Sequence, residues 1–433
     1  MALGGGNFLV ENKILPGTYI NFVSLDRPSN IFSDRGYAAI GMDLDWGSDG
    51  ITTIETSDLQ RESLELLGYS YTDDKLKAIR EIMLHAKTLY LGRLNKGGEK
   101  AKGVLGSLNI TAKYAGIRGN DIQVEIDSDI DNEGYYKVLI KFGDIRAYNK
   151  TVKDIKELEE NKFVDFKGSI SETGQVKLAN GTNGTANGQA HSDFLEEIEK
   201  YYFNTIAYAG TDKQTKGLYR EFVKRLRDDE GVKCVAVLYK EAANYEGVIN
   251  VTSKALEDEV ALVYWLLGAS AGAEINESLT NFKYDGDYSL DTNYKQRELK
   301  EAIKKGEFVF HKVGEDVRAL RDINSFTEFT KKKNDDFSSN QVIRVLDQLA
   351  IDVAKIFNER YVGKVQNNKD GRISFWKDIV FQAETMQRLG AIEDFDSEDI
   401  KVMRGFSKKA VATEYLIKPV AAMEQLYMVV TVG

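Results

Sequence analysis

The chain has 433 residues, of which 42% are hydrophobic and 29% charged, and its formal net charge at pH 7 is −10. This balance is typical of a globular protein with a substantial core, and the length suffices for about two or three domains. The acidic balance argues against nucleic acid as the main partner, since phosphate binding needs clustered cations. No apolar run approaches the ~18 residues of a membrane span, and the N-terminus has neither a basic nor an apolar signal region, so we expect no membrane contact and no signal peptide.

The charge is unevenly distributed along the chain. From Arg321 to the C-terminus, 17 basic and 17 acidic residues balance, so the excess acid lies in residues 1–320. A neutral C-terminal segment is compatible with a surface that faces an acidic partner, or with no function at all.

The one cysteine, Cys234, lies in the strand-like stretch VKCVAVLY. It indicates a reducing compartment without a disulfide framework, and we expect it to pack rather than act as a nucleophile.

The first 102 residues predict an extended arm followed by an α/β layer. The arm, residues 1–24, holds a strand-prone run interrupted at Pro16, and proline confines such a strand to an edge or an arm. The run consists of Ile14, Leu15, Thr18, Tyr19, Ile20, Phe22 and Val23. Two short strands around a glycine-rich turn follow, then helices over 58–68 and 72–86 with Asp58 and Thr72 as N-caps, then the buried strand TLYLGRL. Strands alternating with helices favour an α/β core.

Residues 103–186 predict an inserted β-sandwich. Alternating runs separated by turn residues at even spacing (SLNITAKYA, NDIQVEIDS, YYKVLIKFG, KFVDFKGSI, GQVKLANG) are typical of that fold. The flexible stretch NGTNGTANGQA ends the insertion. Helices over 192–203, 213–228 and 253–272 then alternate with the strands TIAYAG and KCVAVLY, which resumes the core.

From Ile323 the pattern predicts an α+β C-terminal domain. SSNQVIRVLDQLAIDVAKIFNERYVG reads as a long amphipathic helix with an apolar stripe, and ISFWKDIVFQAETMQRLG as a second helix. The stripe comprises Val342, Val345, Leu346, Leu349, Val353, Ile356 and Phe357. ATEYLIKPVAAMEQLYMVVTVG contains two strand-like runs about Pro419. The second run forms a terminal strand arm of Leu426, Tyr427, Met428, Val429, Val430 and Val432.

The stretch GASAG, residues 268–272, matches the G-x-S-x-G pattern of a hydrolase nucleophile elbow. An elbow needs a strand before its serine, but SKALEDEVALVYWLL reads as a helix capped by Ser253. Its apolar stripe of Leu256, Val260, Val263 and Leu267 continues onto Ser270. We place His85 in a helix, His191 in the flexible return and His311 in the strand-like EFVFHKVG, and only His311 follows Ser270. We therefore expect Ser270 to pack against a neighbouring helix and not to act in catalysis.

Metal and phosphate motifs are weak throughout the sequence. One cysteine and three dispersed histidines give no zinc spacing. QNNKDGRISFWK, residues 366–377, resembles a calcium loop but has Gln366 and Lys377 where acids are required, so we interpret it as a turn. EDFDSED, residues 393–399, is expected to be a solvated acidic loop. No P-loop or Rossmann fingerprint occurs. We predict no catalytic residues, no metal and no cofactor.

Several stretches together resemble the contractile tail sheath proteins of myophages, R-type bacteriocins and defective prophage particles. The opening GGGNFLVENKILPGTYINFVS and SDRGYAAIGMDLDWG resemble the N-terminal arm and first strands of Gram-positive-type sheaths. KYAGIRGNDIQVEI, residues 113–126, is similar to the signature K-Y-x-G-x-R-G-N-D-I of the sandwich insertion, and GASAGAEINESLTNFKY to a core segment ending in N-x-S-L-T. The resemblance spans nearly the whole chain.

This resemblance implies a subtilisin-like α/β core without protease activity, an outward-facing sandwich and a C-terminal domain that packs on the tail tube. It implies that both arms add strands to sheets of neighbouring subunits, which suits the apolar strands at both chain ends. Head-to-tail contacts that do not close then give a helical assembly. Contraction would repack the cores into a wider, shorter lattice while the arms keep the mesh connected, and so drive the tube through the target envelope.

The resulting division is 1–24 arm, 25–102 and 187–322 core, 103–186 sandwich, and 323–433 tube-facing domain with its terminal arm. The implied partners are further copies of the chain, the tail tube protein, and baseplate and tail terminator proteins, with no nucleic acid and no membrane. Assembly is expected in the host cytoplasm, followed by residence in the virion or bacteriocin tail sheath. Two alternatives remain, a serine hydrolase built on Ser270 and a soluble adhesin or binding module that uses the sandwich.

Overall fold

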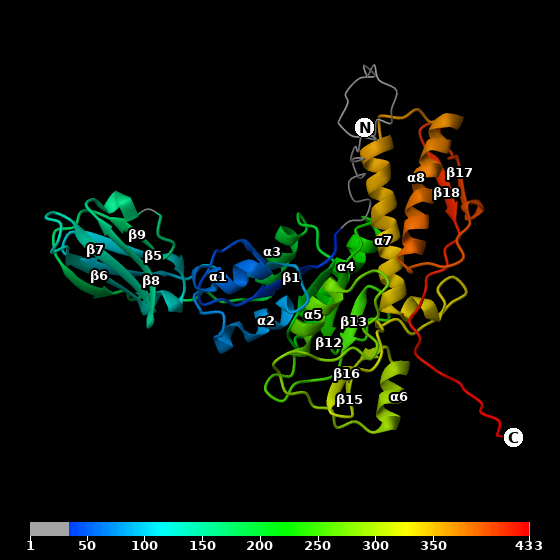
Figure 1. The fold of residues 1–433 in the computed structure, drawn as a ribbon, viewed down its shortest axis with the longest axis horizontal. Coiled ribbons are helices and arrows are strands. Elements are labelled where there is room, and N and C mark those ends of the chain that lie inside the picture. Colours follow the sequence, from blue (N-terminus) through cyan, green and yellow to red (C-terminus); the bar gives the residue numbers. More distant parts are fainter. Residues whose placement is uncertain (1–33, 159, 433) are drawn as a thin grey trace, which may run out of the picture.

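The computed structural model describes residues 34–158 and 160–432 and shows three parts in a row (Figure 1). A β-sandwich lies at one end, an α/β core in the middle, and a pair of long helices with a β-hairpin at the other end. The architecture is therefore mixed α/β with a separate sandwich. The predicted N-terminal arm, including all its strand residues, lies outside the described residues.

The core is built on a seven-stranded sheet in the order β14-β13-β12-β11-β1-β3-β2. The first six strands of this order are parallel, and β2 joins β3 antiparallel. Parallel sheets are covered on both faces, which explains the nearly continuous burial of β12 and β13. The strands are β1 Tyr37–Met42, β2 Ile51–Glu55, β3 Thr88–Arg93, β11 Thr205–Tyr208, β12 Val235–Tyr239, β13 Val248–Val251 and β14 Glu307–Phe308.

Helices cover both faces of this sheet. Side chains alternate along each strand, so Ala38 and Ile40 of β1 join one hydrophobic cluster and Ala39 joins another. The first cluster packs α1 Thr56–Leu67, α2 Lys77–Met83 and α5 Leu262–Gly272 on the sheet. The second packs α3 Gly188–Ile198 and α4 Lys213–Asp228 on the opposite face. Beside these lie α6 Gln296–Lys304 and the hairpin of β15 Phe310–Val313 and β16 Asp316–Ala319.

The sandwich packs a sheet of β10-β6-β7-β8 against one of β4-β5-β9, and neighbouring strands are antiparallel. Its strands are β4 Lys100–Leu105, β5 Leu108–Ala115, β6 Ile122–Ser128, β7 Tyr136–Phe142, β8 Ile145–Val152, β9 Val164–Lys167 and β10 Gly174–Lys177. Trp46 belongs to the core stretch of the chain, yet it is fully buried in the hydrophobic cluster of the sandwich. The two parts therefore share side chains at their boundary.

The C-terminal part consists of two helices and a hairpin around their own hydrophobic cluster. Ser339 caps α7 Asn340–Ile356, which continues into a π-helical turn over Phe357–Tyr361. Asn368 caps α8 Lys369–Arg388 by accepting a hydrogen bond from the Gly371 amide. The hairpin of β17 Ile400–Arg404 and β18 Val411–Tyr415 follows. Residues 416–432, which contain no helix or regular strand, are called the C-terminal segment below.

Several local predictions of helix limits and caps were wrong. Glu55 rather than Asp58 precedes α1, and the Asp73 side chain rather than Thr72 caps the 3-10 turn before α2. The predicted helix over 192–203 begins earlier, since Asn187 caps α3. The start of the predicted helix over 253–272 is irregular, because the Leu256 amide bonds to the Ser289 carbonyl. The stretch 366–377, predicted to be a turn, mostly belongs to α8.

Within the described residues, no helix has both the length and the apolar character needed to cross a bilayer. The same residues contain no cluster of three or more His, Cys, Asp or Glu side chains that could hold a metal ion.

Candidate subunit interface

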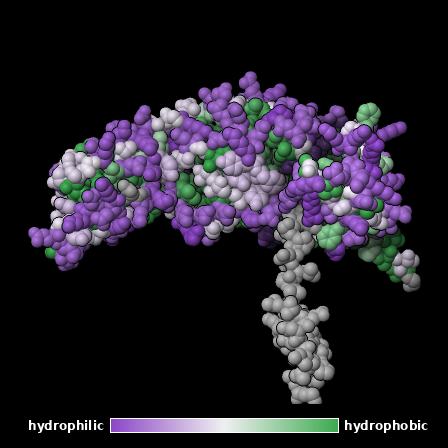
Figure 2. Space-filling model, turned by 90° about the horizontal axis from the view of Figure 1, so that it is seen from above, coloured by the Kyte–Doolittle hydropathy of each residue, from purple (hydrophilic) through white to green (hydrophobic). Residues whose placement is uncertain are grey.

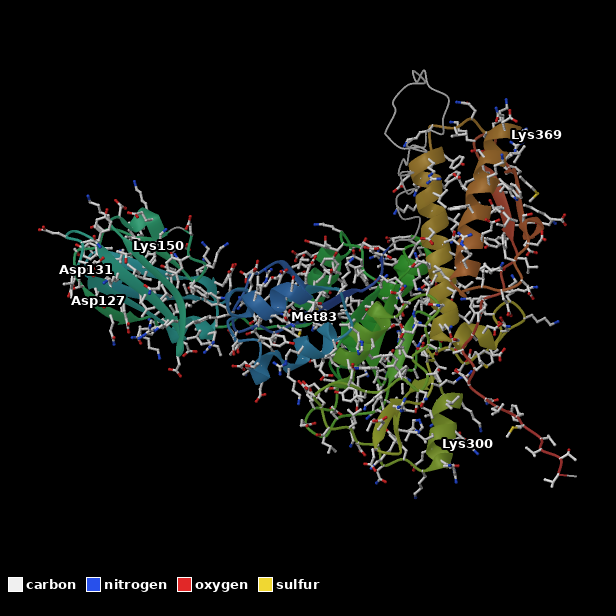
Figure 3. The ribbon with its side chains drawn as sticks, in the orientation of Figure 1. Met83, Asp127, Asp131, Lys150, Lys300 and Lys369 are labelled. Atoms are coloured by element: carbon white, nitrogen blue, oxygen red, sulfur yellow. The ribbon has the colours of Figure 1, made fainter. Side chains whose placement is uncertain are left out.

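The GASAG stretch lies in the second half of α5, against the end of α2, where Met83 is labelled in Figure 3. A Cβ atom on Gly268 would lie 2.0 Å from the Ile82 carbonyl oxygen, and one on Gly272 would lie 2.1 Å from the His85 carbonyl oxygen. Only glycine allows such an approach. Ser270, between the two glycines, is buried inside a regular helix and not on a strained turn. The motif is a helix-packing contact, as predicted.

The three histidines make contacts away from Ser270. His85 lies in the turn after α2, and its Nε2 is 3.0 Å from the Asp285 carboxylate. His191 lies within α3 and not in a flexible return, with its Nδ1 3.1 Å from the Tyr219 hydroxyl. Burial lowers the pKa of both His191 and His311. Neither of these two hydrogen bonds brings a histidine to Ser270.

Ser270 instead contributes its carbonyl oxygen to a contact at the end of α5. Arg35 donates from Nη2 to the Ser270 carbonyl at 3.2 Å and from Nε to the Ala273 carbonyl at 2.9 Å. A cation at the carboxyl end of a helix satisfies its free carbonyls and complements its dipole. Burial, and then the nearby charge of Arg344, lower the pKa of Arg35 to about 10.

The predicted C-terminal strand residues lie together at the end of the C-terminal segment. Their side chains are between 70% and 94% exposed, and Figure 2 shows hydrophobic side chains gathered at this end of the molecule. Monomeric proteins rarely expose contiguous apolar surface of this kind unless a partner covers it. We call Leu426, Tyr427, Met428, Val429, Val430 and Val432 the terminal apolar run. Among the described residues it pairs with no strand of its own chain.

The part of the C-terminal segment that precedes this run is tied to the molecule. The Val420 amide donates to the Ala391 carbonyl at 2.9 Å, and the Ala422 amide to Gln341 Oε1 at 3.0 Å. Glu424 accepts hydrogen bonds from the side chains of Thr280 and Arg321. We call this part, residues 416–424, the root of the segment. The root therefore belongs to the subunit's own surface.

The stretch Asn276–Thr280 joins the core to the C-terminal helices. Gln341 of α7 donates from Nε2 to the Asn276 carbonyl at 3.0 Å, and Arg344 donates to the Glu277 carbonyl at 3.4 Å. Asn276 itself donates from its side chain to the Leu389 carbonyl, just after α8, at 2.8 Å. One turn of the core thus contacts both long helices.

Two buried ion pairs strengthen this joint. Arg227 of α4 makes a bidentate contact with Asp347 of α7, at 2.5 and 2.8 Å. Burial alone lowers the pKa of Arg227, but the Asp347 carboxylate more than offsets it, so the pKa is raised. Arg344 pairs with Asp322 at 3.2 Å, and both side chains are almost inaccessible. Removing one partner of such a pair leaves an uncompensated buried charge, so we expect the loss of any one of these four side chains to destabilise the joint.

The stretch Lys113–Ile122 forms the corresponding joint between core and sandwich. A Cβ atom on Gly116 would lie 2.0 Å from the Asp45 carbonyl oxygen. Arg118 donates from Nε to the Gly68 carbonyl at 2.7 Å, and its guanidinium lies 4.7 Å from the centre of the Tyr69 ring. Core and sandwich are therefore in close contact at this turn.

Comparisons with known proteins indicate one protein family over most of the chain. Family models match three consecutive stretches: the phage tail sheath protein beta-sandwich domain at residues 96–183, the central domain at 184–325 and the C-terminal domain at 332–433. The crystal structure of a sheath tail protein from Desulfitobacterium hafniense is 37% identical and covers 94% of this chain and 98% of its own, with a TM-score of 0.81. This chain belongs to the phage tail sheath protein family.

Two further comparisons, one of sequence and one of structure, support different conclusions. The phage-like element PBSX protein XkdK of Bacillus subtilis strain 168 is 29% identical, over 100% of both chains. The helical sheath of the anti-feeding prophage in its contracted state covers 97% of this chain and 99% of its own, with a TM-score of 0.57. Its sequence identity is only 11%, so this likeness concerns the fold alone.

The two sequence signatures of the sheath resemblance turn out to lie at the two joints. K-Y-x-G-x-R-G-N-D-I meets the core at the turn between β5 and β6 of the sandwich, and N-x-S-L-T meets the C-terminal helices. Sequence analysis found both motifs but gave neither a physical role. It also missed the pairing of Arg227 with Asp347. The available signal was the presence of Arg344 and Asp347 beside the apolar stripe of the predicted helix.

Proposed function

We propose that this chain is the structural subunit of a contractile tail sheath, which polymerises helically around a tail tube and drives the tube through a target envelope. The observation that carries the proposal is the terminal apolar run, whose exposure is unexplained in a single chain. Sheath-family similarity over residues 96–325 and 332–433 supplies the context, since such a protein functions as one of many copies.

We propose that the run, with the arm residues Ile14–Val23, adds strands to sheets of neighbouring subunits. A candidate acceptor is the hairpin of β17 and β18, because in a two-stranded sheet both strands are edges. An edge offers unpaired amide and carbonyl groups, and strand addition uses them for affinity. Because donor and acceptor are different surfaces of one chain, the contact is head-to-tail and propagates into a helix or ring.

The finer domain description belongs to the same proposal. Six parallel strands with helices on both faces support the subtilisin-like core. The limits of the three family models, 96–183, 184–325 and 332–433, support a division into 103–186, 187–322 and 323–433, from which no limit differs by more than nine residues. The sandwich then faces outward and the neutral C-terminal domain faces the tube.

We propose that the chain is not an enzyme and uses no cofactor. Burial of Ser270 inside α5 gives a substrate no access to its hydroxyl, which argues against the serine hydrolase. The partners would be further copies of this chain, the tail tube protein, and baseplate and terminator proteins. Nucleic acid and membrane are not expected partners. The subunit would assemble in the host cytoplasm and then form part of a virion or bacteriocin tail.

Electron microscopy of the purified full-length chain tests the proposal. We expect striated tubes at high protein concentration. A protein that remains monomeric at every concentration would instead favour the adhesin alternative, in which the sandwich binds a partner.

A further inference from the structure

The carboxylate of Glu424 joins three segments that are distant in the sequence. Its Oε1 accepts a hydrogen bond from the Thr280 hydroxyl at 2.9 Å, and its Oε2 accepts one from Arg321 Nε at 2.7 Å. Thr280 closes the N-x-S-L-T stretch and Arg321 follows β16. Both oxygens of the carboxylate are thus held by side chains of the core.

The donors are themselves held by the buried joint. The Asp322 amide donates to the Thr280 hydroxyl oxygen at 2.9 Å, which orients that hydroxyl toward Glu424. Asp322 is almost fully buried and accepts hydrogen bonds from the Asn340 side chain and the Leu279 amide. It also pairs with Arg344 of α7. The Glu424 contact therefore sits at the rim of a buried polar network that joins the core to α7.

The ties end at this residue. Beyond Glu424, within the described chain, Tyr427 donates from its hydroxyl to the Gln425 side chain at 2.7 Å, which is a contact inside the segment itself. The segment leaves the molecule on the side of α6, where Lys300 is labelled, and far from the start of α8 at Lys369 (Figure 3). Glu424 is thus the boundary between the anchored root and the exposed terminal apolar run.

We infer that Thr280, Arg321 and Glu424 form a clasp that sets the direction in which the terminal apolar run leaves its subunit, and so prepares it for donation to a second copy. The inference rests on the proposed function, since it assumes that the run is donated. If the clasp is broken, each root residue that it had held must be ordered again on assembly. The entropy cost weakens the contact between subunits by about tenfold for each such residue. Exposed ion pairs contribute little to folding stability, so the clasp acts on assembly and not on the fold.

The first test compares Glu424→Ala with the wild-type chain under tube-forming conditions. The quantity measured is the concentration of subunit left unassembled after the tubes are sedimented. We expect it to rise about tenfold in the variant, since roughly one residue of ordered root is lost. The melting temperature should not change. The matched control is Asp165→Ala, which breaks an ion pair of similar exposure with Lys113 in the sandwich and should change neither value.

The second test reverses the charges. Arg321→Glu and Glu424→Arg should each impair assembly, and the double variant should recover most of it, because the attraction between the two positions is restored. Assembly of Glu424→Ala at the wild-type concentration would overturn the clasp. So would a lowered melting temperature in Glu424→Ala, which would make the contact part of the fold. A wild-type chain that forms no tubes would contradict the proposed function, and the clasp with it.

Discussion

The helix α5 and the terminal apolar run are both strongly apolar in sequence, but the structure treats them oppositely. In α5, every residue from Leu262 to Ala271 except Tyr264 is buried, whereas the terminal apolar run is largely exposed. The difference is where the covering surface lies. The chain itself supplies the cover for α5, while the described chain supplies none for the run. Apolar composition therefore indicates that a surface will be covered, but not by which molecule.

The same substitution in both regions gives the largest contrast. Leu266→Asp places an unpaired carboxylate in a fully buried site and should cost about 5 kcal/mol or more, enough to prevent stable folding. Val429→Asp should leave the far-ultraviolet spectrum and melting temperature unchanged and abolish tubes. Circular dichroism and electron microscopy report the two outcomes. If Val429→Asp also unfolds the protein, the run belongs to the subunit's own core.

Removing the run sharpens the contrast further. A chain that ends at Glu424 keeps the bonded root and loses only exposed side chains, so it should stay folded and form no tubes. Deletion of residues 1–24 should have the same effect if the N-terminal arm is donated in the same way. Thermal melting checks the fold and electron microscopy checks assembly. Regular tubes from either truncated chain would show that its arm is not a linker.

Crowding α5 should cost less than charging it. Gly272→Ala forces a methyl group against the His85 carbonyl, and Ser270→Leu overfills a buried position on the other face of α5, so each should cost about 1–3 kcal/mol. Differential scanning calorimetry measures the lowered melting temperature. Gly188→Ala is the control, because a Cβ atom there meets nothing within 4 Å. Equal melting temperatures for Gly272→Ala and Gly188→Ala would mean that α2 and α5 pack more loosely than described.

The smallest effect is expected for Ser270→Ala. The Arg35 contact uses the backbone carbonyl of this residue, so loss of the hydroxyl leaves it intact. Assembly should be unchanged, and a fluorophosphonate probe should label neither form of the protein. Esterase turnover that disappears in the variant would restore the nucleophile-elbow interpretation.

Elements defined by local pattern could be predicted from the sequence. The helix expected over 213–228 is α4, Lys213–Asp228, because its cap and its apolar face agree. The helical setting of GASAG and five of the sandwich strands were also predicted. The exposed end of the C-terminal segment was identified by its composition, but its pairing with another subunit stays a prediction.

Elements set by tertiary contacts could not be predicted. The amphipathic pattern of α7 indicated that Leu346 and Leu349 face the core, yet both are only partly buried while Arg344 and Asp347 are buried. The reason is that the neighbouring surface offers Asp322 and Arg227 as partners, from distant parts of the chain. Trp46 likewise lies in the part of the sequence predicted to form the core, but its side chain is buried in the sandwich. Hydrophobicity alone does not reveal such complementary charges or shared side chains.

The three tryptophans of the chain have a spectroscopic consequence. Trp46 lies in the hydrophobic cluster of the sandwich, Trp265 in that of the core, and Trp376 packs against that of the C-terminal part. The indole nitrogen of each donates a hydrogen bond to a different group, the Glu65 carbonyl, the Asp285 carboxylate and the Ile400 carbonyl. Replacing any two by phenylalanine leaves a single fluorophore in one part. The emission of each such variant would follow the loosening of that part alone, in free subunits and in an assembled lattice.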